Sequence, residues 1–219
     1  MGRRALKKID DELDLSRHFH TLETLPRPWS QEAVFGRTAP LEVEMGSGKG
    51  LFLQNAAQRI PERNFLGVEV SYKYARYSAA RLARRGLDNG CCVHGDGLKM
   101  FREILPDGCA MGVHVYFPDP WWKARHKKRR VLNEAFLEDA ARVLCEGGRL
   151  HFWTDVQEYY ETTLELIAQF KQFEGPLSVE ARPAEHDLDY HTHFERRTRL
   201  AGEPVYRSEF LRRSNPDAA

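Results

Sequence analysis

The sequence predicts an α/β fold with a mostly parallel sheet, because strand-like and helix-like segments alternate along most of the chain. Strands are expected at 41–45, 65–70, 90–94, 110–117 and 149–153, and the candidates for closing strands are 177–182 and 205–211. Helices are expected at about 50–60, 71–85, 98–105, 129–144 and 155–173. Alternation of this kind builds right-handed βαβ units, whose strands run parallel.

Turn and cap residues mark the ends of the first elements. Residues 41–45 alternate apolar and acidic side chains, which is typical of a strand. Pro61 ends the helix that follows, because proline cannot continue a helix. Ser71 is a favourable N-cap for the next helix, and Gly86 is a favourable residue at its C-terminal end.

The second half of the chain continues the pattern. Residues 110–117 are apolar enough for a buried central strand. Residues 129–144 carry apolar side chains at helical spacing, and Gly147 and Gly148 separate this helix from the next strand. Asp155 is a favourable N-cap for the last helix of the regular pattern.

The pattern covers one domain. We predict a single domain over residues 39–219, and an N-terminal arm over residues 1–38, which fit no βα unit. The 219-residue chain has a formal net charge of only +1, so any strongly basic segment is local. A basic patch on a nearly neutral protein indicates an oriented polyanion site more than general stickiness.

Cysteine usage and hydropathy favour a cytoplasmic location. The four cysteines, Cys91, Cys92, Cys109 and Cys145, lack the spacing of a zinc site or a disulfide framework and are expected to be free thiols. The N-terminus is charged but has no apolar segment of a secretory signal. No segment approaches the roughly 18 apolar residues of a membrane helix.

The most informative segment is residues 116–130. Pro118 and Pro120 flank Asp119 and restrict the backbone on both sides of it, which predicts a stiff, extended turn. Trp121 and Trp122 follow. They could stack on a base, but the preferred interpretation places one of them in the core and the other on the wall of a crevice. Six of the eight residues from Lys123 to Arg130 are Lys or Arg. A rigid acid beside flat rings and a polyanion-binding run suggests chemistry on a nucleic acid base.

A glycine-rich loop follows the first strand of the pattern. Gly46, Gly48 and Gly50 lie between a strand and a helix, where glycine lets the backbone approach a ligand closely. The loop is not a P-loop, because Lys49 precedes a glycine and not Ser or Thr. It also departs from the dinucleotide pattern G-x-G-x-x-G, since Leu occupies position 51.

Three acids lie at or near the ends of the first three strands: Glu44, Glu69 and Asp96. In a doubly wound sheet these ends open onto one crevice, and an acid after the second strand commonly accepts hydrogen bonds from ribose hydroxyls. A pyrophosphate would avoid the negative charge of Glu44, whereas an ammonium and a sulfonium would favour it. The residues therefore favour S-adenosylmethionine over a dinucleotide.

The chain resembles the bacterial tRNA (guanine-N(7)-)-methyltransferases over roughly residues 40–200. The residues that carry the resemblance are Glu44–Gly50, Gly67–Glu69, Asp96, Phe117–Trp121, Lys123 with the basic run to Arg130, Trp153–Asp155 and Thr192–Glu195. It implies a Rossmann-like class I methyltransferase fold, doubly wound, with a seven-stranded sheet whose last strand is antiparallel. It also implies methyl transfer from S-adenosylmethionine to N7 of a tRNA guanosine, usually at position 46 in the variable loop.

The resemblance also implies site residues. The methyl-donor site would include the glycine loop (Gly46, Gly48, Gly50) and Glu44, Glu69, Asp96 and Asp119. The guanosine site would be lined by Lys123, Asp155, Thr192, His193, Phe194 and Glu195. The residues expected to bind tRNA phosphates are Arg125, His126, Lys127, Lys128, Arg129 and Arg130.

A carboxylate is the expected group on the acceptor base. Guanine offers N–H donors on its Watson–Crick edge, and Asp119, Asp155 and Glu195 are the available acceptors. A fixed negative charge would also stabilise the positive charge that develops on the base during transfer. Asp119 is the first choice for this catalytic role, because the prolines hold it still.

Two other functions remain open at this stage. An exocyclic-amine methyltransferase often carries Asp/Asn-Pro-Pro followed by an aromatic residue, which is one proline more than Asp119-Pro120-Trp121. A non-catalytic RNA-binding protein on the same fold is the second alternative, but it would not need the full acidic set. Histidines at 186, 191 and 193 invite a metal interpretation, yet methyl transfer to N7 needs none, and none is expected. The expected partner is tRNA, without a membrane or a required protein partner, for a monomer or homodimer.

Overall fold

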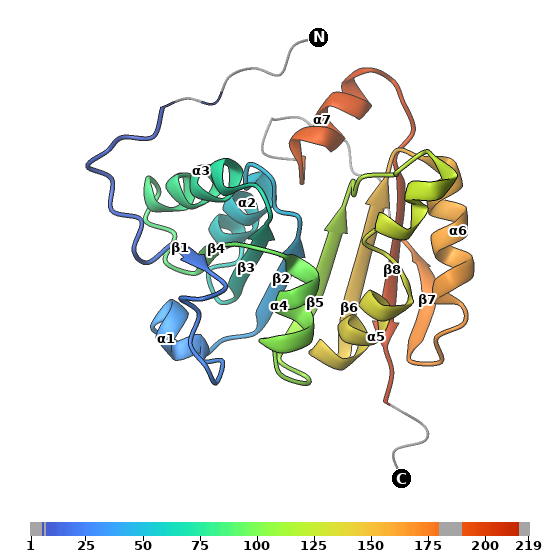
Figure 1. Cartoon of the computed structure of the whole chain (residues 1–219), viewed down its shortest axis with the longest axis horizontal. Helices are drawn as coiled ribbons and strands as arrows, with labels where there is room; N and C mark the ends of the chain where they lie inside the picture. Colours follow the sequence, from blue (N-terminus) through green and yellow to red (C-terminus); the bar gives the residue numbers. More distant parts are fainter. Residues whose placement is uncertain (1–5, 7, 180–189, 215–219) are drawn as a thin grey trace.

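The computed structural model of the protein describes residues 6, 8–179 and 190–214, and one mixed sheet lies at its centre (Figure 1). The strands are β1 (Phe19–Thr21), β2 (Leu41–Met45), β3 (Asn64–Glu69), β4 (Gly90–His94), β5 (Ala110–Tyr116), β6 (Leu144–Thr154), β7 (Phe173–Ser178) and β8 (Tyr206–Arg212). The helices are α1 (Gln31–Phe35), α2 (Leu51–Arg59), α3 (Tyr72–Ala83), α4 (Gly97–Glu103), η1 (Ala124–Arg129), α5 (Glu134–Val143), α6 (Gln157–Ile167) and α7 (His193–Leu200).

The strand order is β1-β4-β3-β2-β5-β6-β8-β7. Strands β2 to β6 run parallel to one another, and β8 is antiparallel to both β6 and β7. The predicted α/β fold with a mostly parallel sheet and an antiparallel last strand is therefore confirmed. The sheet has one strand more than expected, because β1 comes from within residues 1–38 and pairs in parallel with β4.

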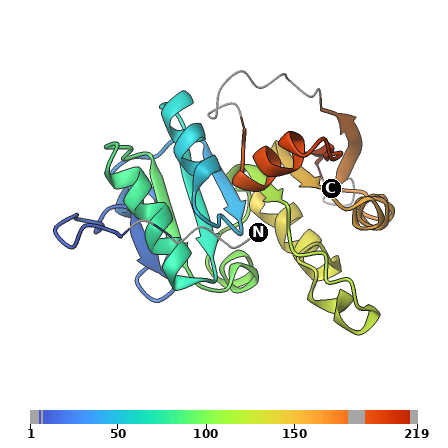
Figure 2. The same ribbon diagram turned by 90° about the horizontal axis from the view of Figure 1, so that it is seen from above.

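Helices cover both faces of the sheet, as the view from above shows (Figure 2). On one face α2 and α3 bury a cluster that includes Phe52, Phe65 and Leu82. On the other face α4, α5 and α6 pack on the sheet through residues such as Phe136 and Tyr159. Within the described ranges, every helix is too short or too polar to cross a membrane.

The expected elements differ from the observed ones mainly after residue 120. Residues 124–129 form the 3-10 helix η1, so α5 begins only at Glu134, where the Asn133 side chain accepts a hydrogen bond from the Phe136 N–H. Strand β7 occupies 173–178 where the expected helix 155–173 was to end, and it overlaps the candidate 177–182 only in part. Residues 180–182 of that candidate lie outside the described residues.

Helix α7 was not expected from the sequence. Thr192 is its N-cap, and its hydroxyl accepts a hydrogen bond from the Glu195 N–H at 3.0 Å. Figure 1 shows α7 above the C-terminal ends of the parallel strands. The helix therefore brings the C-terminal part of the chain to the same edge as the glycine loop.

Candidate active site

Five predicted acids come together at the edge where the parallel strands end. Glu44 lies next to the last residue of β2, and Glu69 is the last residue of β3. Asp96, Asp119 and Asp155 follow β4, β5 and β6. The strand order reverses direction between β2 and β5, since β3 lies on one side of β2 and β5 on the other. Ligands of doubly wound folds bind at such a switch point. The edge is therefore the candidate site.

The glycine loop presents open backbone to this edge. Gly46 and Gly48 have φ angles of 77° and 52°, and a Cβ atom on either would meet nothing within 4 Å. At Gly50 a Cβ atom would lie 2.0 Å from the Ser78 hydroxyl oxygen, so only glycine lets the start of α2 approach α3. No side chain caps α2, because Gly50 is its N-cap. The loop and the first turn of α2 thus offer backbone N–H groups to a ligand.

Glu44 is a buried carboxyl group with an unsatisfied oxygen. Its side chain is 2% exposed, and Oε2 has no hydrogen-bond partner among the described residues. Burial, reinforced by the charge of nearby Glu69, raises the pKa of Glu44 to about 8. A buried polar oxygen without a partner is costly to the fold. The group therefore fits a ligand that brings a cation to this position, such as the ammonium of an amino acid.

Glu69 connects the glycine loop to the next strand. One carboxylate oxygen accepts a hydrogen bond from the Gly48 N–H and the other from the Ser71 N–H, both at 2.8 Å. Its side chain is 9% exposed, at the end of β3. Asp96, two residues after the end of β4, is exposed. It caps α4 by accepting a 2.9 Å hydrogen bond from the Leu98 N–H. Glu69 is thus oriented by backbone groups before any ligand binds.

The segment around Asp119 lies outside the helices and strands, as expected of the turn that the two prolines predict. Phe117 and Trp121, on either side of the Pro-Asp-Pro sequence, have positive φ angles of 49° and 46°. Such angles are uncommon for residues with a Cβ atom and cluster at functional sites. The exposed Asp119 side chain lines a hollow of about 390 Å³, together with Pro120, Trp121, Trp122, Lys123 and His126.

Both tryptophans belong to the surface of this hollow. Trp121 is half-buried and Trp122 is 69% exposed. The prediction that one of them packs in the core was wrong.

The basic run folds as η1 and ends at Arg130. Residues three apart lie one above the other in a 3-10 helix. Lys127 and Arg130 accordingly reach the same acceptor: Lys127 Nζ lies 2.5 Å from Glu158 Oε1, and an Arg130 terminal nitrogen lies 2.6 Å from Glu158 Oε2. Arg130 is only 7% exposed. The prediction that Arg130 binds a phosphate conflicts with this buried position.

Residues three apart form two further rows along η1. His126 meets the Trp121 ring edge-on, with centroids 5.9 Å apart, and the Arg129 guanidinium lies over the same ring at 5.0 Å. Arg125 and Lys128 form the third row and are exposed. The run is therefore divided into an inner row, a row on Trp121 and an outer row.

The segment Thr192–Glu195 forms the start of α7. Phe194 stacks on Phe117 with ring centroids 5.9 Å apart, and a His193 ring nitrogen lies 3.2 Å from an Arg81 nitrogen. These contacts place the segment beside the loop that follows β5. The predicted guanosine-site residues 119, 123, 155 and 192–195 thus lie on elements that meet at one edge of the sheet, as Figure 1 shows for α7 and the strand ends.

Glu195 differs from the other acids, because its carboxylate is already bound. One oxygen accepts from the His191 N–H at 2.6 Å, and the other is 3.2 Å from nitrogens of both Arg199 and Arg207. The side chain is 1% exposed. Burial alone would raise the pKa of Glu195, but the side chain and backbone N–H of His191, and next Arg207, outweigh it and lower the pKa to about 2. Glu195 therefore anchors α7.

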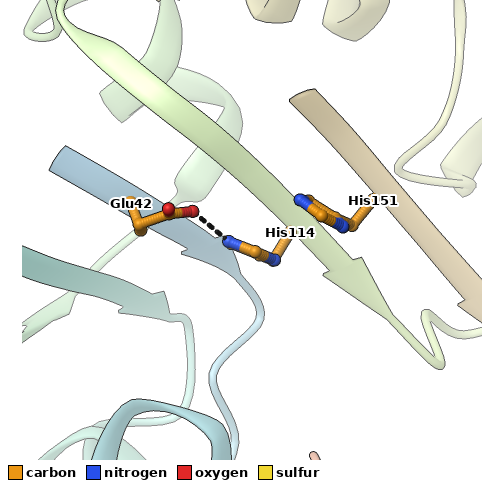
Figure 3. Close-up of side chains that lie close together, drawn as sticks. All are labelled: Glu42, His114 and His151. Atoms are coloured by element: carbon orange, nitrogen blue, oxygen red, sulfur yellow. Dashed lines mark hydrogen bonds and ion pairs between the residues drawn. The ribbon is translucent and has the colours of Figure 1, made fainter. Parts of the chain in front are cut away.

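A buried polar cluster beneath the site was missed by the sequence analysis. Glu42, His114 and His151 come from the adjacent strands β2, β5 and β6 and lie on one face of the sheet (Figure 3). His114 Nε2 lies 2.6 Å from Glu42 Oε2, and His114 Nδ1 lies 2.8 Å from the Tyr116 hydroxyl. The carboxylate of Glu42 only accepts, so Nε2 carries the proton and Nδ1 accepts from the tyrosine.

This cluster is a hydrogen-bonded array in its present orientation. Its three side chains offer ligand atoms within 4.8 Å of one another. However, a metal lies in the plane of each imidazole that binds it, and the His114 and His151 rings are stacked 4.3 Å apart at an angle of 14°. Nearly parallel rings share no such position, so at least one ring would have to turn to bind a common ion.

The alternation of residues 41–45 could have revealed Glu42. Side chains two apart in a strand lie on the same face, so Glu42 and Glu44 face the same way, with Glu42 farther from the ligand edge. Such an acid needs a partner inside the sheet. Gly112 leaves room for the pair, since a Cβ atom there would lie 1.9 Å from Glu42 Oε2. Of the histidine-rich tail, residues 186–189 lie outside the described residues, and His191 and His193 lie within them.

The chain is similar to known proteins in both sequence and structure. Residues 38–208 match the family described as "Putative methyltransferase". Among solved structures, the 16S rRNA methyltransferase KamB superposes with a TM-score of 0.60 at 15% identity, over 84% of this chain and 92% of that chain. An identity this low shows a common fold.

Sequence relatives are more specific. A tRNA (guanine-N(7)-)-methyltransferase of Rhodopirellula baltica is 49% identical over 98% of this chain and 81% of its own length. An enzyme of the same name from Aromatoleum aromaticum is 35% identical over 92% of this chain and 80% of its own length. The chain belongs to the family of the tRNA (guanine-N(7)-)-methyltransferases.

Proposed function

We propose that the protein transfers a methyl group from S-adenosylmethionine to N7 of a guanosine in tRNA, at position 46 of the variable loop. The observation that carries the proposal is the buried Glu44 oxygen without a partner, beside an open glycine loop and one strand away from the rigid Asp119 turn. The names of the two relatives favour tRNA and N7 over other acceptors.

The donor half of the site consists of Glu44, the loop 46–50 and Glu69, and these residues fit the donor. Glu44 would accept from the ammonium group, because its free oxygen lacks a protein donor. Gly46 and Gly48 would let the ligand lie against the backbone. Glu69 would accept from the ribose hydroxyls, the usual role of an acid at the end of the second strand of such a sheet. When bound, S-adenosylmethionine supplies the electrophilic methyl group.

The acceptor half consists of the loop 117–123, η1 and Asp155, and it would hold the base. Guanine N7 has an in-plane lone pair and no proton, so the transfer requires no general base. Alignment of the reacting atoms supplies most of the effect, and orientation can contribute as much as about 7–11 kcal/mol. Asp119 and Asp155 are the acids that the geometry favours for the Watson–Crick edge, because Glu195 is already bound by Arg199 and Arg207.

The outer row of η1 would bind the RNA backbone. Arg125 and Lys128 are exposed on the same short helix whose inner row is anchored to α6. Cations in this position would bind phosphates and orient the tRNA without reading its sequence. All the proposed site residues come from one chain, so we propose a monomer or homodimer that needs no other protein.

The test is methylation of unmodified tRNA with labelled donor, followed by mapping of the labelled nucleotide. Borohydride and aniline cleave RNA at N7-methylguanosine, so cleavage at position 46 is the expected result. Label that resists this cleavage would identify an exocyclic-amine methyltransferase. Tight tRNA binding without donor binding would identify a non-catalytic RNA-binding protein.

A further inference from the structure

Arg130 ends the most basic segment of the protein, yet its guanidinium is enclosed. Its Nε donates to the Pro120 carbonyl oxygen at 2.8 Å, and a terminal nitrogen donates to Glu158 at 2.6 Å. The other terminal nitrogen lies 3.3 Å from the Thr162 hydroxyl. The guanidinium also lies 4.4 Å from the centre of the Tyr159 ring. Each of the three guanidinium nitrogens therefore has an acceptor within the protein.

The acceptor at Pro120 belongs to the strained loop that carries Asp119. Positive φ angles such as those of Phe117 and Trp121 are strained for residues with a Cβ atom and persist only where surrounding contacts hold them. At one end of the loop the Phe117 N–H donates to the Trp153 carbonyl oxygen at 2.8 Å. At the other end the Arg130 guanidinium binds the carbonyl of Pro120, the residue next to Asp119.

We propose that Arg130 is a positioning residue: it fixes the Pro118–Pro120 turn to α6 and so sets the place of the Asp119 carboxylate. The inference rests on the proposed function, because it acts through Asp119. It assigns Arg130 a role in turnover and removes it from the residues that bind phosphate. Lys127 joins the same Glu158, so η1 and the turn share one anchor on α6.

Arginine suits this task better than lysine. Its planar fork directs donors toward Pro120, Glu158 and Thr162 at the same time, whereas an ammonium is a point charge on a flexible stem. A buried charge without its partners is strongly destabilising, and the arrangement around Arg130 satisfies it with a carboxylate and an aromatic face.

The experiment compares two neighbouring arginines that the structure separates. Arg130→Lys should lower the turnover at saturating tRNA by between about ten- and hundredfold, the range expected when a reacting group is displaced by about 1 Å. Its tRNA affinity and the salt dependence of binding should stay unchanged. Arg129→Ala, on the exposed row beside Trp121, should instead weaken tRNA binding and reduce the salt slope by about 0.7–0.9. Thermal unfolding checks that Arg130→Lys is folded, and Arg130→Gln replaces it otherwise.

A double-mutant cycle with Asp119→Asn gives the decisive readout. If Arg130 acts through Asp119, Arg130→Lys should cost less than about twofold in single-turnover rate once Asp119 is already Asn. Additive losses, or a flattened salt slope for Arg130→Lys, would overturn the inference while leaving the proposed function intact. Near-normal turnover of Asp119→Asn alone would overturn the proposed role of Asp119 and the inference with it.

Discussion

The proposed donor half and the proposed acceptor half of the site are built in opposite ways. In the donor half, Glu44 and Glu69 are buried and Glu69 is held by two backbone N–H groups. In the acceptor half, Asp119 and Trp122 are exposed, and the loop is held through its backbone. A small charged ligand needs a desolvated site formed in advance, where interactions are strong. A folded RNA has a large surface of its own, so it can cover an acceptor half that is open in the free protein.

The largest expected effect tests the acceptor half. Asp119→Asn should lower the rate of methyl transfer about 10²–10³-fold, because it removes the charge that stabilises the developing positive charge on the base. Donor affinity from calorimetry should change by less than about twofold, since the contact is made in the transition state. A large loss of donor affinity would place Asp119 in the donor half and contradict the division of the site into two halves.

The second effect tests the donor half. Glu69→Ala should weaken S-adenosylmethionine binding by about 1–3 kcal/mol, because the ribose hydroxyls and the Gly48 N–H both lose an acceptor. Calorimetry gives the affinity, and Glu62→Ala, an exposed acid before β3, is the matched control. Donor affinity that does not change in Glu69→Ala would remove this residue from the site.

The third effect is the release of a proton when the donor binds. The pKa of Glu44 is raised to about 8, so the folded protein without donor keeps a proton that the unfolded chain releases near pH 4.5. Folded stability should therefore fall as the pH rises from about 4.5 to 8. An arriving ammonium favours the carboxylate, so binding near pH 7 should release about one proton. Calorimetry in buffers of different ionisation enthalpy measures it, and Glu44→Gln should abolish it.

The smallest effect concerns the cluster beneath the site. Burial, and next the neighbouring His151, lower the pKa of His114 to about 4. The unfolded chain then binds more protons between about pH 4 and 6.5, so stability should decline as the pH falls through this window. One such group contributes at most about 1.4 kcal/mol per pH unit. Denaturant unfolding of His114→Gln should show a shallower decline, and an equal decline would assign the pH dependence to other groups.

The two halves also differed in how well the sequence predicted them. The strands, the glycine loop and the acids at the strand ends followed from alternation and from the topology of parallel sheets, which places all these ends at one edge. The places of Glu44 and Glu69 at this edge could be predicted because each acid lies at or next to the end of a regular strand, and their contacts with a donor stay predictions.

The acceptor half was predicted only in part, because it is irregular. Charge alone does not say which of six cations turns inward, and Arg130 does so only because a 3-10 helix aligns it with Lys127 over Glu158. Helix α7 was missed although Thr192 and Glu195 stand at the spacing of a capping box, a signal obscured by the basic residues that follow. Glu195 was expected on the base, and its acidic character alone did not reveal that Arg199 and Arg207 bind its carboxylate.

The short strand β1 covers one edge of the parallel part of the sheet. By pairing with β4 from Phe19↔Cys92 to Thr21↔His94, it covers backbone groups that would otherwise lie open beside the buried Cys92 and Val93. A long open strand is a template for other chains, and a very short edge strand is a common natural defence. Removal of residues 19–21 should therefore cause precipitation that grows with protein concentration, before any step of the chemistry is affected.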